Sequence, residues 1–150
     1  MGKISKDFSG EELLPKELYE RFGDLATRYL NPKIILVAQA LRSFYKKEVR
    51  VNGWKNGGID GRTIRTQSDR AYSATSDHTY GNAIDFDIVG VAAAQVQDDV
   101  INNAWLNAVL LKIGVTAMEK NTATWTHLSV ADFTYWVQCE EVNGIKLLNP

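Results

Sequence analysis

Residues 76–88 read SDHTYGNAIDFDI, and this stretch decides how the rest of the chain is interpreted. From residue 83 onward, apolar residues alternate with Asp85 and Asp87. Successive side chains of a strand point to opposite faces of a sheet, so the alternation predicts a strand with one apolar and one acidic face. Gly81 favours a turn just before this strand.

Helices are predicted on the N-terminal side of this strand, and further strands on both sides. Apolar residues recur at helical spacing over residues 18–29 and 34–45, and Asn31-Pro32 separates the two stretches as N-cap and first helical residue. A third helix is predicted over 92–113, and strands over 48–52, 83–88, 115–119 and 125–130. The predicted fold class is α+β, with N-terminal helices packed on a small, largely antiparallel sheet.

Composition narrows the class of protein. The chain has 150 residues, a length that predicts a single domain over residues 1–150. Of these residues 45% are hydrophobic and 23% are charged, and the net charge is -1. Nucleic-acid binding draws on a basic surface, so we expect no nucleic-acid partner. The longest apolar runs are far shorter than the roughly 20 residues that span a bilayer, and no signal peptide is visible, so we expect no membrane insertion and a cytoplasmic location in the producing cell.

The two histidines of the chain stand in contexts that suggest a metal site. His78 lies seven residues before Asp85, and a loop turning into a strand at Gly81 can bring the two side chains together. His127 lies in the predicted strand 125–130. Two imidazoles and one carboxylate leave a fourth tetrahedral position open, which is typical of a catalytic zinc site. We therefore predict one Zn²⁺ per chain, held by His78, Asp85 and His127.

Glu119 is the candidate general acid/base. It ends the strand that leads into the hairpin before His127, and the two residues are an even number of positions apart. A symmetric hairpin can place both side chains on the same face of the sheet. A carboxylate there could move the protons that amide hydrolysis requires.

These residues form a spaced pattern that resembles a known family. The pattern is Ser76-x-His78-x-x-Gly81-x-Ala83-x-Asp85, followed by Trp125-x-His127. It resembles the zinc D-alanyl-D-alanine carboxypeptidases and L-alanyl-D-glutamate endopeptidases, which have a hedgehog-type fold, and it is most similar to their short phage endolysin-like members. The resemblance implies the same zinc ligands, with Glu119 as acid/base. Many relatives carry the catalytic acid three residues before the last histidine, where this chain has Thr124.

The resemblance also implies an arginine that holds the carbonyl or carboxylate of the substrate. Arg65 is the best match to that position, and Arg62 is the next. A guanidinium there could make paired hydrogen bonds to a carboxylate and stabilise a developing oxyanion. Trp54, Trp125 and Ser76 are further candidates for substrate contact at the cleft.

The sequence thus predicts a zinc metallopeptidase that hydrolyses an amide bond in bacterial peptidoglycan stem peptides, as an endolysin-like endopeptidase or a D,D-carboxypeptidase. Such an enzyme would act on the cell wall after release from the producing cell, or as a virion-associated protein. The alternative from another class is a zinc-containing module of the same fold that binds cell-wall peptides or builds a virion without hydrolysis. Thr124 is the residue that keeps this alternative open.

Overall fold

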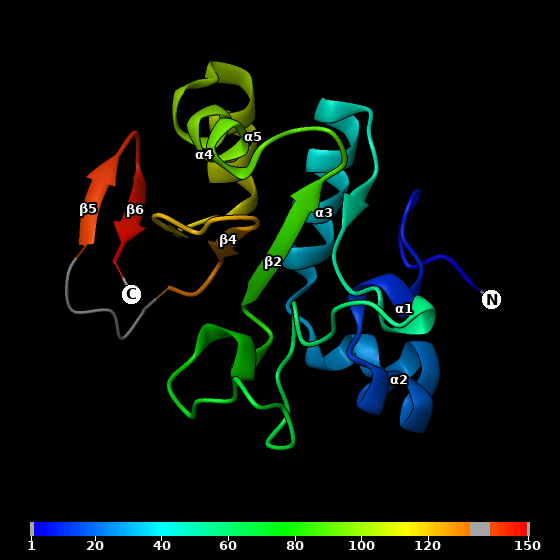
Figure 1. Cartoon of the computed structure of the whole chain (residues 1–150). Helices are drawn as coiled ribbons and strands as arrows, with labels where there is room; N and C mark the ends of the chain where they lie inside the picture. The colour runs from blue at the N-terminus through cyan, green and yellow to red at the C-terminus, as the bar shows by residue number, and fades with distance from the viewer. Residues whose placement is uncertain (1, 133–138, 150) are drawn as a thin grey trace.

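The computed structural model describes residues 2–132 and 139–149 of the chain (Figure 1). In this described part, five α-helices and three 3-10 helices accompany one six-stranded sheet. The buried apolar residues of the helices and the sheet form one connected cluster. The predicted α+β class is confirmed.

Local sequence signals set the helix boundaries. The Ser9 and Glu12 side chains form a capping box at the start of α1, and the Asn31 side chain accepts a hydrogen bond from Lys33 N–H at the start of α3. None of the described helices is long and apolar enough to cross a membrane. The helices are α1 (Gly10–Leu13), α2 (Lys16–Phe22), η1 (Gly23–Tyr29), α3 (Pro32–Tyr45), η2 (Trp54–Asn56), η3 (Asp77–Tyr80), α4 (Ala93–Asn102) and α5 (Ala104–Ile113).

The sheet has the strand order β1-β2-β4-β3-β6-β5. Its strands are β1 (Val49–Arg50), β2 (Ala83–Ile88), β3 (Ala117–Glu119), β4 (Thr126–Ser129), β5 (Cys139–Val142) and β6 (Ile145–Leu148). Every pair of neighbouring strands is antiparallel except β3 and β6, which are parallel. The sheet is therefore largely antiparallel, as predicted.

The two faces of β2 have different surroundings. Ile84 and Phe86 are fully buried in the apolar cluster, and both α3 and α4 contact β2. Asp85 and Asp87 point to the opposite face, where the long connection between β1 and β2 runs alongside the strand and Asp85 N–H donates to the carbonyl of Arg62 at 2.7 Å. This second face carries the candidate site.

Two of the predicted helices were wrong in detail. The predicted helix 18–29 changes at Gly23, whose φ of +57° is unfavourable in a helix, into the 3-10 helix η1. The predicted helix 92–113 is two helices, because Asn103 ends α4 and its side chain caps α5 by accepting from Leu106 N–H. The hairpin of β5 and β6 was not predicted, and the aromatic residues just before it lie outside the described residues.

Candidate metal centre

Three side chains with metal-ligating atoms meet on the acidic face of the sheet. His78 comes from η3, Asp85 from β2 and His127 from β4, and one ligand atom of each lies within 4.8 Å of the others. Their exposed fractions are 1%, 6% and 5%. Buried polar groups this close together need a shared proton or cation to satisfy them. The cluster could hold a metal ion.

The local fold explains why these residues converge. Asp85 is the register partner of His127 in the antiparallel pair of β2 and β4, so both side chains emerge on the same face. His78 is brought over this face by a turn at Gly81, whose φ is +69°. The Ser76 side chain caps η3 by accepting a hydrogen bond from His78 N–H at 3.3 Å. Ser76 therefore helps to position the turn that carries His78.

Hydrogen bonds orient the imidazole of His78. Its Nδ1 lies 2.9 Å from the carbonyl oxygen of Thr63, which can only accept, so Nδ1 carries the proton and Nε2 presents its lone pair to the cluster. Burial lowers the pKa of His78, against the opposing effect of Asp85. A neutral imidazole with its other nitrogen donating to a carbonyl is the usual state of a metal-ligating histidine.

Asp85 is the centre of the polar contacts. Its Oδ1 lies 2.7 Å from His127 Nδ1 and 3.3 Å from His78 Nε2, and its Oδ2 accepts from Arg65 Nη2 at 2.9 Å. Burial favours the neutral acid, but the hydrogen bond from His127 and the charges of the two nearby imidazoles outweigh it, and the pKa of Asp85 falls well below its usual value. The carboxyl group of Asp85 is therefore ionised at neutral pH.

Glu119 extends the row of residues across the sheet. In the pairing of β3 with β4, Ala117 faces Ser129 and Met118 faces Leu128, so the next residues in register are Glu119 and His127. Glu119 is half-buried, and burial raises the pKa of its carboxyl group. The charges of His127, Asp85 and Arg65 also act on this pKa, as expected for a group beside the cluster. A carboxyl group in this environment can hold or release a proton nearer to neutral pH.

The atoms of the cluster fit a small cation. His78 Nε2 lies 3.2 Å from His127 Nδ1, and each lies 3.3 Å or less from Asp85 Oδ1. Ligands about 2.0–2.1 Å from a tetrahedral ion are separated from one another by roughly 3.3 Å. A cation would replace the proton that His127 shares with Asp85, with only a small outward movement of these atoms.

No known protein family, curated protein or solved structure matches this chain. The functional argument therefore stands on the residues and on the geometry of the cluster.

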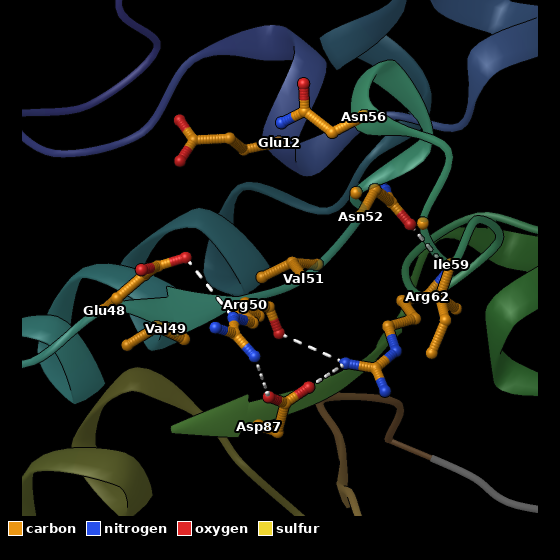
Figure 2. Close-up of a pocket in the computed structure, with 12 residues that line it drawn as sticks. Glu12, Glu48, Val49, Arg50, Val51, Asn52, Asn56, Ile59, Arg62 and Asp87 are labelled. Atoms are coloured by element: carbon orange, nitrogen blue, oxygen red, sulfur yellow. Dashed lines mark hydrogen bonds and ion pairs between the residues drawn. The ribbon is translucent and has the colours of Figure 1, made fainter. Parts of the chain in front are cut away.

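The two candidate arginines, Arg65 and Arg62, contact different acidic residues of β2. The Arg65 side chain contacts the cluster through Asp85, and its Nε donates to the carbonyl of Gly61 at 3.1 Å. Arg62 instead lies 2.6 Å from Asp87 in a separate pocket of about 520 Å³ beside β1, with its Nη1 also 3.3 Å from the carbonyl of Arg50 (Figure 2). Among the described contacts, Arg62 meets Asp85 only through its main chain.

The two candidate tryptophans differ in their placement. The Nε1 of Trp54 donates to the carbonyl of Leu14 at 2.9 Å, and its ring lies 5.8 Å from that of Tyr19, so this side chain joins the N-terminal helices to the loop. Trp125 is half-buried just before β4, two residues before His127. Of the two, Trp125 is nearer to the candidate metal centre along the chain.

Two main-chain carbonyl groups that hold the side chains of the site were not predicted from the sequence. The carbonyl of Thr63 orients His78, and the carbonyl of Gly61 holds Arg65. Both partners are main-chain oxygens, which every residue carries, so residue type gives no signal for them. The one available signal was the long polar loop itself, since loops of more than about 15 residues in a compact domain are usually functional.

Proposed function

We propose that this protein is a zinc metallopeptidase that hydrolyses an amide bond in bacterial peptidoglycan stem peptides. The observation that carries the proposal is the meeting of His78, Asp85 and His127 from three separate segments, with Glu119 on the neighbouring strand. Two neutral nitrogen ligands and one carboxylate favour zinc over magnesium or calcium, which prefer oxygen ligands. One ion per chain would satisfy these three ligands.

The residues around the cluster support hydrolysis. A bound zinc would supply Lewis-acid polarisation of the scissile carbonyl. Glu119, with its raised pKa, would accept a proton from the attacking water and deliver it to the leaving amine. Arg65, held by Asp85 and Gly61, would place a fixed positive charge beside the developing oxyanion. These roles require no further cofactor.

The substrate class is supported by the spaced pattern from Ser76 to Asp85 and by Trp125-x-His127, which resembles that of cell-wall zinc peptidases. The proposed protein acts on the cell wall after release from the cell that makes it. The non-catalytic binding module is the other outcome of the experiment that follows.

Digestion of purified peptidoglycan by the zinc-loaded protein tests the proposal. We expect new free amines, with the cleaved bond identified by mass spectrometry of the muropeptides. Glu119→Gln keeps the size of the side chain and removes the titrating group, so hydrolysis should fall by about 10²–10⁴-fold while zinc is retained. Glu141→Gln on β5, an exposed glutamate, is the matched control and should cleave normally.

Two results would count against the proposal. Normal cleavage by a folded, zinc-loaded Glu119→Gln protein would remove Glu119 from the mechanism. Absence of any new amine with the wild-type protein, together with binding of peptidoglycan, would favour the binding module.

A further inference from the structure

A groove of about 560 Å³ begins beside Arg65 on the side of α2 and η1. Its wall contains four aromatic rings and two guanidinium groups, contributed by Arg21, Phe22, Tyr29, Arg65, Tyr72 and Tyr80. Phe22, Tyr29 and Tyr80 are exposed by 38%, 51% and 62%, which is unusually open for large apolar side chains. These six residues are called the aromatic groove below.

Arg65 connects the aromatic groove with the candidate metal centre. Arg65 lines the groove and contacts Asp85 through its Nη2. Ile64 and Thr79, which also line it, are the chain neighbours of Thr63 and His78. Arg65 N–H donates to the carbonyl of His78 at 3.1 Å and fixes the two walls to each other. A peptide that reaches both the cluster and the groove would pass over this shared arginine.

The charge of the aromatic groove favours an anionic ligand. No carboxylate side chain contributes to its lining, whereas two arginines do. Arg65 is already paired with Asp85, so Arg21 is the cation that remains for a ligand. The guanidinium of Arg21 lies 5.1 Å from the centre of the Phe22 ring and makes none of the ion pairs found within the described residues.

Glu17 is the acidic residue on α2 whose charge interacts with Arg21. Its carboxylate accepts hydrogen bonds from the Thr66 and Ser68 hydroxyls, both at 2.5 Å, and it lines a different pocket. Glu17 is thus hydrogen-bonded to the loop, in part through Thr66, which itself lines the groove, and makes no ion pair with Arg21 within the described residues. The groove itself keeps a positive lining.

We propose that the aromatic groove binds a carboxylate-bearing residue of the peptide substrate, with Arg21 as the specificity-determining residue. The proposal rests on the proposed peptidase function. The carboxylate would pair with the Arg21 guanidinium, and the aliphatic part of the peptide would pack on the rings of Tyr29 and Tyr80. Peptidoglycan stem peptides carry such a group, the carboxylate of their D-glutamyl residue, which can be amidated without changing the length of the peptide.

Two synthetic stem peptides provide the test: one has a free D-glutamyl carboxylate, and the other has the same group amidated. Dissociation constants are measured by titration of the zinc-loaded Glu119→Gln protein. The value of kcat/KM is measured with the protein that retains Glu119. We expect the free acid to bind about fivefold more tightly, the effect of one partly exposed ion pair. Arg21→Gln should abolish this preference, and Arg21→Lys should retain part of it.

Arg28→Gln is the matched control, because Arg28 is an exposed arginine on η1 that lines a different pocket. It removes the same charge and should leave the preference intact. Equal affinity of the wild-type groove for both peptides, no binding of either, or an unchanged preference in Arg21→Gln would each overturn the proposal. Failure of the peptidase function would differ from these results, since the peptides would then bind selectively without being hydrolysed.

Discussion

Glu119 combines a proposed catalytic role with an unfavourable position for a charge. Burial beside the cluster raises the pKa of its carboxyl group above the ordinary value of 4.5. The unfolded chain therefore loses this proton at a lower pH than the folded chain does. The folded protein is destabilised as the pH rises through the folded pKa of Glu119, and this effect is absent well below pH 4.5.

We predict that Glu119→Gln stabilises the metal-free protein at pH 7. The midpoint temperature should rise by about 1–2 °C, a small shift because solvent screens a half-exposed group. At pH 3.5 the variant and the wild type should melt at the same temperature. Thermal unfolding in the presence of a chelator measures the midpoint temperatures of both proteins at the two pH values. A lower midpoint at pH 7 would show that the carboxylate makes a favourable contact in the fold.

The residue types and their spacing from Ser76 to His127 were enough to select the three candidate ligands, which the structure brings together. They were not enough to separate Arg65 from Arg62. The two arginines lie three residues apart in one loop, and each faces an acidic residue of β2, Asp85 or Asp87. The choice depends on the alignment of the loop with β2, which only the folded chain fixes.

Among the elements, the turn between η3 and β2 controls the position of His78. Gly81 has a φ of +69°, and a Cβ added there would lie 2.2 Å from the carbonyl oxygen of Tyr29. The same glycine accepts a hydrogen bond from Asn31 N–H at 3.0 Å, which joins the turn to the start of α3. The neighbouring main chain therefore leaves no room for a side chain.

We predict that Gly81→Ala costs about 2 kcal/mol or more, from the left-handed conformation and the contact with main chain together. The midpoint temperature should fall by roughly 4–8 °C, and zinc content should fall with it as His78 moves. Gly57→Ala is the control, since Gly57 has a similar φ of +74° but no atom within 4 Å of an added Cβ. Equal losses in the two variants would show that the contact with Tyr29 is unimportant.

Elements with local signals were predicted well, and those with long-range partners were not. The N-cap of α3 and the alternation of β2 depend on residues that are adjacent in the sequence, and both predictions were confirmed. Asn103 falls within a run whose apolar period continues through the break between α4 and α5, so periodicity alone hides the break. β6 pairs with β3, which lies far away in the sequence, and no local pattern shows such a pairing.

At the scale of the whole molecule, a metal ion would act as a cross-link. His127 is separated by 42 residues from Asp85 and by 49 from His78, so the ion would join segments that are distant in the sequence. An ion that binds the folded chain and not the unfolded one stabilises the folded state by mass action.

We predict that removal of zinc by a chelator lowers the midpoint temperature. At a free zinc concentration about 100 times the dissociation constant, the stabilisation is about 2.7 kcal/mol, which corresponds to roughly 5–10 °C for a chain of this size. Differential scanning calorimetry with and without zinc measures the shift. His127→Ala should bind little zinc by metal analysis and show no zinc-dependent shift; a shift of wild-type size in this variant would exclude His127 as a ligand.

The alternation of side chains along β2 has a consequence for how the protein can change during evolution. Asp85 and Asp87 lie on one face of β2, while Ile84 and Phe86, which alternate with them, face the helices. Substitutions at every second residue can therefore change the chemistry of one face of the sheet without altering the packing of the other face. A hydrolase and a binding protein can therefore share this scaffold and differ in the residues of that one face.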